Sequence, residues 1–147
     1  MGGRGASIGT KFYHNGKEWL KYGDEFKTVH TVGNIKFVEN KIDTNTKAPK
    51  ETRTQGRIYV TVNKKEDKPQ YITYYDDVGK KFKQLDINQH NNHKVSIDGK
   101  LVELDNKHHH WGYEHEEFGS GNLSAVERKM VANVLWEWRK YKRGKKQ

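Results

Sequence analysis

Cysteine is missing from this chain of 147 residues. Its absence excludes disulfide bonds and thiolate metal ligands, and it leaves the redox compartment of the protein open. No apolar run approaches the roughly 18 residues that a membrane-spanning helix needs, and the start MGGRGASIG lacks the apolar stretch of a secretory signal. The sequence therefore predicts neither a membrane protein nor a disulfide-stabilised one.

Hydrophobic residues are also scarce, at 32% of the chain even when tyrosine is counted. A globular domain normally has a larger apolar share, so we expect a lean core. The 8 Tyr, 5 Phe and 4 Trp residues partly compensate, because each aromatic ring buries a large area. This composition favours a single small domain with long polar loops.

Positive charge is concentrated at the C-terminus, although the whole chain has a net charge of +9. Residues 139–147 contain no acid. Their cations are Arg139, Lys140, Lys142, Arg143, Lys145 and Lys146. A basic patch of this kind is typical of proteins that contact a polyanion, so these six residues are the predicted nucleic-acid-binding site. A tail that only improves solubility is the alternative, and the sequence leaves both open.

The middle of the chain predicts a β-sheet. The segments RIYVTVN (57–63), QYITYYD (70–76) and KFKQLDI (81–87) alternate apolar and polar residues and are separated by turn-rich stretches. This pattern indicates an antiparallel meander with one packed face and one solvated face. Further strands are expected at residues 27–32 and 35–40, and a tight Asp-Gly hairpin is expected at 95–104.

The last element is predicted to be an amphipathic helix. Ser124 is a suitable N-cap and Glu127 follows three residues later, which completes a capping box. One apolar stripe follows, formed by Met130, Val131, Val134, Leu135, Trp138 and Tyr141. We expect this helix to lie across the packed face of the sheet, which gives an α+β fold.

Three regions of the chain are expected to differ in order. Residues 1–26 are predicted to be a glycine-rich mobile arm followed by a weak aromatic segment, either a short helix or a covering arm. Residues 27–143 should form the single α+β domain, and residues 144–147 a basic tail.

Histidine is the most conspicuous residue in DNKHHHWGYEHEEFGSG (105–121), which holds four of the chain's 8 histidines. In an extended segment His108 and His110 share a face, and His115 could return across a turn at Gly112 as a third metal ligand. However, this spacing matches no established zinc signature, and HExxH is absent. We therefore expect no metal and no other cofactor, with His108, His110 and His115 as the alternative metal ligands.

Acid–base chemistry without a metal is a second interpretation of the same segment. Cleaving an RNA strand requires a base for the 2′-hydroxyl and an acid for the leaving oxygen, and histidine suits both roles near neutral pH. His110 and His115 are the predicted acid–base pair. The other candidate groups are His109, Tyr113, Ser124, Ser120, the pair His90 and His93, and the cations Arg57, Lys81 and Lys83. The need for a 2′-hydroxyl would make RNA the substrate.

A third interpretation assigns no chemistry to the histidines. The segment would be a solvated loop, with Trp111 and Tyr113 buried as anchors and its glycines serving turns. In this interpretation Trp111 belongs to the core rather than to a surface that stacks on nucleic-acid bases.

Several segments resemble proteins of Gram-positive phages and prophages. GGRGAS resembles a start common among their small proteins. RIYVTVNKK…ITYYDDVGKKFKQLDI and HHHWGYEHEE…G…LSAVERKMV, over residues 57–138, resemble an uncharacterised phage family. Similar domains are attached to Mu-type head-morphogenesis proteins and are often assigned to the barnase–EndoU–colicin–RelE ribonuclease superfamily, which is a small α+β fold without metal. The matching site residues are His109, His110, Gly112, Tyr113, His115 and Ser124, with Trp111 in the intervening position.

These observations predict a small basic phage protein in the cytoplasm of a bacterial host. A metal-independent endoribonuclease-like domain acting on RNA is the leading hypothesis. One alternative is a non-enzymatic inhibitor that binds a host defence nucleoprotein, as an anti-CRISPR protein does. Another is a morphogenesis accessory protein. No membrane partner is expected, and the sequence predicts no oligomeric state.

Overall fold

The structure is a computed structural model. This structure describes residues 6–7, 12–14, 17–20, 26–41, 46–52, 56–88, 94–97, 100–103, 107–113 and 119–145. The strands among them are β1 (Ala6–Ser7), β2 (Phe12–His14), β3 (Lys17–Leu20), β4 (Phe26–Val32), β5 (Ile35–Asn40), β6 (Glu51–Thr52), β7 (Ile58–Asn63), β8 (Lys68–Tyr75), β9 (Lys81–Asp86), β10 (Lys94–Ile97), β11 (Lys100–Glu103), β12 (His108–Trp111) and β13 (Ser120–Asn122). The helix among them is α1 (Ala125–Lys145).

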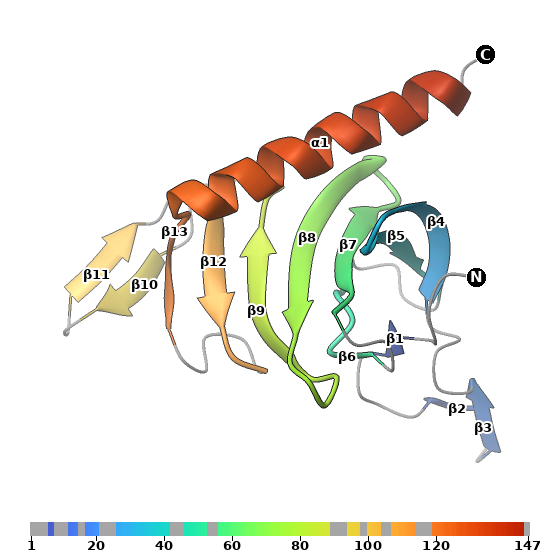
Figure 1. The fold of residues 1–147 in the computed structure, drawn as a ribbon. Coiled ribbons are helices and arrows are strands. Elements are labelled where there is room, and N and C mark those ends of the chain that lie inside the picture. Colours follow the sequence, from blue (N-terminus) through green and yellow to red (C-terminus); the bar gives the residue numbers. More distant parts are fainter. Residues whose placement is uncertain are drawn as a thin grey trace.

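A seven-stranded sheet with one helix against it dominates the described part of the chain (Figure 1). The strand order is β13-β12-β9-β8-β7-β5-β4. All neighbours are antiparallel except β5 and β7, which run parallel. This architecture confirms the predicted α+β fold and the meander β7–β8–β9. The parallel pairing of β5 with β7 was not predicted.

Shorter pairings lie outside this sheet. β10 and β11 form the hairpin expected at residues 95–104, and β1 pairs with β6. β2 pairs with β3, so the described residues of the aromatic segment are strands and the short-helix interpretation of that segment is wrong. His108–Trp111 is likewise a strand, β12, and not part of a loop.

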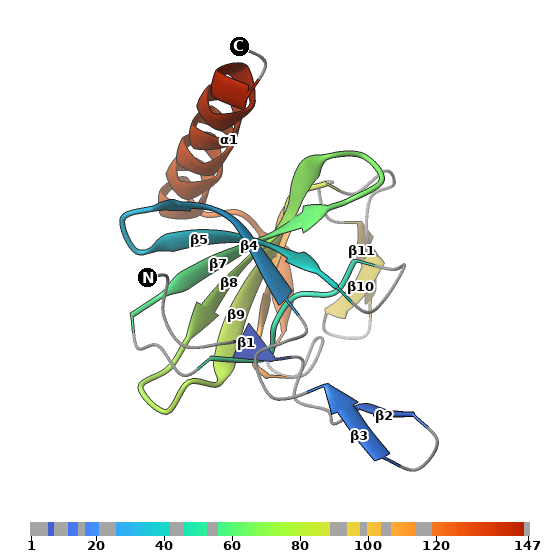
Figure 2. The ribbon, with the colours of Figure 1, turned by 90° about the vertical axis from the view of Figure 1, so that its right-hand side faces the viewer.

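Helix α1 lies across the sheet (Figures 1 and 2), and its apolar stripe packs on the strands, as predicted. Val131, Val134 and Trp138 are buried against core residues of the strands. Met130, Leu135 and Tyr141 are partly buried against the same core. The strand residues of this core are Ile35, Phe37, Val60, Val62, Ile72 and Leu85. The apolar face of the sheet is therefore the face that α1 covers.

The N-terminus of α1 begins as predicted, whereas its C-terminus lies beyond the predicted boundary. The Glu127 N–H donates to Ser124 Oγ (3.2 Å), and the Ser124 N–H donates to Glu127 Oε1 (2.8 Å), which confirms the capping box. The helix continues to Lys145, past the boundary expected after Arg143. Its cations thus lie on helix up to Lys145. Lys146 lies outside the described residues.

The opposite face of the sheet is more polar and has a smaller apolar cluster, formed by Phe26, Val38, Tyr59 and Tyr75. Residues 46–52 pack on this cluster. The Tyr75 hydroxyl donates to the Pro49 carbonyl (2.6 Å), and Thr52 Oγ1 and the Tyr59 hydroxyl are hydrogen-bonded at 2.9 Å. This second face also carries the buried polar side chains of Asp86, His108 and His110.

No helix among the described residues is both long enough and apolar enough to cross a bilayer.

Candidate functional site

Strand β12 sends its three histidines to two different faces of the sheet. Successive side chains of a strand point to opposite faces. His109 pairs with Leu85, a core residue under α1, and it contacts Glu127 of α1. His108 and His110 therefore both point to the face away from α1. The extended spacing predicted that they share a face, but not which one.

Asp86 of β9 lies against both of these histidines. The register places Asp86 directly opposite His108. Asp86 Oδ2 is 3.0 Å from His110 Nε2 and 3.3 Å from His108 Nε2, and the two Nε2 atoms are 3.0 Å apart. His108 is fully buried, and only 3% of His110 and 4% of Asp86 is exposed. We call Asp86, His108 and His110 the His–Asp cluster.

Hydrogen bonds hold the cluster from outside. Gln84 Nε2 donates to Asp86 Oδ1 (2.8 Å), and Lys81 Nζ donates to Gln84 Oε1 (2.8 Å). His110 Nδ1 is hydrogen-bonded to Ser120 Oγ of the neighbouring strand β13. Asp86 and His110 are therefore fixed in orientation by side chains of the sheet itself.

The charge state of Asp86 follows from these contacts. Burial alone would raise the pKa of its carboxyl group, because it disfavours the charged form. Hydrogen bonds from His108, His110 and Gln84 outweigh this effect and hold the pKa of Asp86 well below its usual range. The cluster therefore contains a buried carboxylate anion.

A second network lies on the helix side of β12. His109 Nδ1 donates to Glu127 Oε1 (2.7 Å), and Lys83 Nζ forms an ion pair with Glu127 Oε2 (2.8 Å). Burial raises the pKa of Glu127, but hydrogen bonds from Lys83, His109 and Ser124 more than compensate and lower it to about 2. Glu127 thus joins the start of α1 to strands β9 and β12.

Tyr113 follows the end of β12 and belongs neither to the His–Asp cluster nor to the network around Glu127. Its hydroxyl donates to Glu51 Oε2 (3.0 Å), and the ammonium groups of Lys50 and Lys80 lie 5.2 and 5.7 Å from its ring centre. It borders an open pocket of about 400 Å³, whose other lining residues are Asp76, Lys80, Lys81, Phe82, Trp111 and Gly112. Trp111 is 38% exposed there, so its expected place in the core is wrong. Trp111 is the last residue of β12 and lies opposite Lys83, which is not part of the core beneath α1.

Among the described residues, the predicted catalytic groups lie in separate places. His110 belongs to the His–Asp cluster, whereas His109 faces α1 on the other side of the sheet. The Ser124 hydroxyl caps the helix, and Tyr113 contacts Glu51. His115, His90 and His93 lie outside the described residues.

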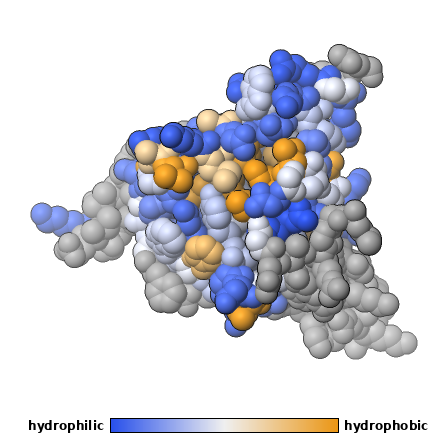
Figure 3. Space-filling view, in the orientation of Figure 1, coloured by the Kyte–Doolittle hydropathy of each residue, from blue (hydrophilic) through white to orange (hydrophobic). Residues whose placement is uncertain are grey.

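The predicted nucleic-acid-binding cations lie on the last two turns of α1. Arg139, Lys140, Arg143 and Lys145 are exposed. Lys142 is partly buried, where it forms an ion pair with Asp67 and lies 5.6 Å from the Trp138 ring. The end of α1 rises away from the sheet in Figure 2, and hydrophilic residues dominate its surface in Figure 3. The structure thus groups these cations on one protruding element.

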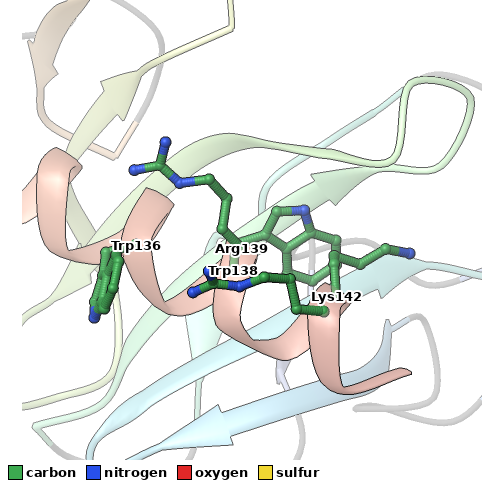
Figure 4. A pocket seen from close by; sticks show the side chains of 5 residues that line it. Trp136, Trp138, Arg139 and Lys142 are labelled. Carbon is green, nitrogen blue, oxygen red and sulfur yellow. The ribbon is translucent and has the colours of Figure 1, made fainter. Parts of the chain in front are cut away.

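Two tryptophans line an open hollow of about 520 Å³ among these cations, together with Arg139, Lys142 and Arg143. Trp138 is buried against the sheet, whereas Trp136 is 50% exposed. The Arg143 guanidinium lies 5.6 Å from the centre of the Trp136 ring. Figure 4 shows the two indoles on different sides of α1, with Arg139 extending from the helix between them.

Asp86 and Trp136 are the site residues that the sequence analysis missed. Asp86 is one acid among 19 Asp and Glu residues, and only the register of β9 with β12 shows that it faces the histidines. Trp136 could have been predicted as a binding residue, because it lies off the apolar stripe of α1 and close in sequence to the cations.

Comparisons of the chain with family models, with curated proteins and with solved structures found no match. The resemblance to phage proteins and to the ribonuclease superfamily therefore stays a prediction.

Proposed function

We propose that this protein acts on nucleic acid and binds it at the C-terminal half of α1. The observation that carries the proposal is the half-exposed indole of Trp136, which lies in an open hollow beside Arg139 and Arg143. Residues 136, 139 and 143 are spaced by three and four, so they share one face of the helix. This face combines a flat ring with cations.

Such a combination suits single-stranded nucleic acid. Exposed aromatic rings stack on bases, and cations contact the phosphates without reading sequence. RNA is the first candidate partner, and the nucleic acid of a host nucleoprotein complex is the alternative. Lys140 and Lys145 extend the positive surface beyond the hollow, since both are exposed.

The test is a binding titration with fluorescently labelled single-stranded RNA and DNA at several salt concentrations. Four exposed cations predict a slope of about −3 for log K against log salt. Trp136→Ala should lower affinity about 5- to 150-fold, which corresponds to the roughly 1–3 kcal/mol of one stacked base. Arg139→Gln combined with Arg143→Gln should reduce the slope by about 1.4.

Lys27→Gln combined with Lys41→Gln is the matched control, because it removes the same charge from exposed residues outside the hollow. Its slope should stay close to that of the wild type. Equal losses in both double variants would show that only net charge matters. A flat salt dependence in the wild type would contradict the proposal.

Metal-independent RNA cleavage by His110 and His115 stays a prediction, with His109, Tyr113 and Ser124 as its other candidate groups. The same RNA samples test it when they are incubated with EDTA and analysed for fragments. Fragments that disappear in a His110→Ala/His115→Ala variant would support it. Intact RNA with bound protein would leave binding alone.

A further inference from the structure

Three atoms of the His–Asp cluster converge on one point inside the protein. His108 Nε2, His110 Nε2 and Asp86 Oδ2 are separated by 3.0, 3.0 and 3.3 Å. All three residues are buried, and their ligand atoms all lie within 4.8 Å of one another. We propose that Asp86, His108 and His110 bind one divalent transition-metal ion, with Zn²⁺ as the first candidate.

The three contacts of this triangle are not all attractive when only hydrogen bonds connect its atoms. The Asp86 carboxylate only accepts, and each Nε2 atom either donates or accepts. If both Nε2 atoms carry a proton, two donors face each other at 3.0 Å. If one lacks its proton, its lone pair faces the carboxylate oxygen. A cation at the centre turns all three contacts into attractions.

The size of the triangle fits a tetrahedral metal site. Zinc lies about 2.0–2.1 Å from histidine nitrogen and about 2.0–2.2 Å from carboxylate oxygen, so neighbouring ligands of a tetrahedron are about 3.3–3.5 Å apart. The observed sides are within a few tenths of an ångström of this spacing. Two imidazoles also favour a transition metal over Mg²⁺ or Ca²⁺, which prefer oxygen ligands.

The outer contacts are those that metal ligands require. A metal-bound histidine usually donates its other ring N–H, which fixes its orientation. His110 Nδ1 is hydrogen-bonded to Ser120 Oγ, which can accept from it when Nε2 binds the metal, and Gln84 Nε2 donates to the second oxygen of Asp86. Strands β9 and β12 supply all three ligands, so the site is preformed on a rigid part of the sheet.

Asp86, His110 and Ser120 also follow the order of a hydrolase triad, namely carboxylate, imidazole and hydroxyl. A triad gives no role to His108, which is fully buried and touches both Asp86 and His110. A metal ion uses all three residues. The proposal thus departs from the expected absence of a metal, and it replaces His115 by Asp86 in the alternative ligand set. It also makes His110 a ligand in place of the acid–base role predicted for it.

The experiment measures Zn²⁺ binding to the full chain after chelation, by calorimetric titration. The wild type should bind one Zn²⁺ per chain at this site. His108→Asn and His110→Asn should each weaken that binding at least 100-fold. His109→Gln is the matched control, because it removes an imidazole from the same strand but from the opposite face. This variant should bind Zn²⁺ as tightly as the wild type. That result would distinguish the proposed site from nonspecific Zn²⁺ binding by the other histidines of the chain.

Two further measurements keep the test decisive if a ligand variant fails to fold. Ser120→Ala should bind Zn²⁺ about 10- to 100-fold more weakly, because it loses only the outer contact to His110. Wild-type protein loaded with Co²⁺ should show the intense visible absorption of a tetrahedral site. Absence of that absorption, or Zn²⁺ binding that is unchanged in His108→Asn and His110→Asn, would overturn the proposal.

Discussion

Glu127 is a buried carboxylate that connects the start of α1 to two strands of the sheet. One carboxylate accepts hydrogen bonds from His109 and from the Ser124 N–H and pairs with Lys83, and only 3% of the residue is exposed. Glu127→Gln should lower the free energy of unfolding by about 2 kcal/mol, because buried partners lose a charged acceptor. Urea denaturation measures this change.

Glu137→Gln is the control for that variant. Glu137 pairs at 3.6 Å with the exposed Lys140, on the same helix. A surface pair of this kind contributes less than about 0.5 kcal/mol. Equal destabilisation by both variants would contradict the role assigned to Glu127.

Glu127 also predicts part of the acid sensitivity. Its pKa falls from 4.5 to about 2 on folding. A group with a lowered folded pKa stabilises the protein fully above its unfolded pKa, and this contribution disappears as the pH falls through the folded value. Between pH 4.5 and 2, wild-type stability should therefore decrease more steeply than that of Glu127→Gln. The readout is the difference between their urea midpoints at each pH, and parallel curves would exclude this mechanism.

At the residue scale, contacts between residues close in sequence were predictable, whereas contacts between residues far apart in sequence were not. The capping box of Ser124 and Glu127 was predictable because both partners lie within one helical turn. So was the shared face of His108 and His110, which follows from strand geometry. The third member, Asp86, was not, because its position depends on the pairing of two strands more than 20 residues apart in sequence.

At the scale of elements, the two tryptophans of α1 separate stability from binding. The Trp138 ring stacks on Phe37 with centroids 5.5 Å apart, and its indole N–H donates to the Asp67 carbonyl (3.2 Å). Trp138→Ala should cost about 3–5 kcal/mol of stability. Trp136→Ala should cost less than about 1 kcal/mol, because that ring is half-exposed and lies beside the guanidinium group of Arg143.

Circular dichroism during thermal and urea unfolding is the appropriate measurement, since tryptophan fluorescence changes with the substitution itself. The outcome that contradicts this assignment is a larger loss of stability from Trp136→Ala than from Trp138→Ala.

Elements with a regular apolar period were predictable, and elements without one were not. Alternation in 57–63, 70–76 and 81–87 gave the meander, and the stripe of α1 gave the helix. β12 has the sequence HHHW, which carries no alternation, and it becomes a strand because β9 and β13 pair with it on both sides. The parallel pairing of β5 with β7 has no local sequence signal either.

At the scale of the whole molecule, Gly79 lets residues 46–52 close over the second face of the sheet. Its φ is +84°, and a Cβ atom there would lie 2.0 Å from the Thr52 carbonyl oxygen. The Thr52 N–H donates to the Gly79 carbonyl (2.8 Å). Gly79→Ala should destabilise the protein by at least about 2 kcal/mol, because it adds a backbone clash to the strain of a positive φ.

Gly33→Ala is the matched control, since Gly33 has a φ of +58° but no atom within 4 Å of its missing Cβ. It should show the strain alone, about 1–2 kcal/mol. In Gly79→Ala, hydrogen exchange of the Thr52 amide should also accelerate, whereas Gly33→Ala should leave it unchanged. Unchanged exchange in both variants would contradict this view of the closure.

The molecule-wide arrangement was the least predictable part. The sequence indicated one solvated face of the sheet, but on that face residues 46–52 pack against Tyr59 and Tyr75, and the His–Asp cluster is buried. A segment of polar loop carries no pattern that shows where it docks. Residues 46–52 contact Tyr59 of β7 and Tyr75 of β8, and these contacts depend on how the strands are arranged in the folded sheet.

The outer strand β4 has one further consequence, for self-association. A flat, unpaired strand at a sheet edge is a template on which another copy can add, and this is the route to fibrils. The register of β4 shifts between Thr28 and His30, and Lys27 is exposed on the strand. The irregular edge and the charge both oppose the addition of a foreign strand, so we expect little amyloid-like growth from this edge of the described sheet.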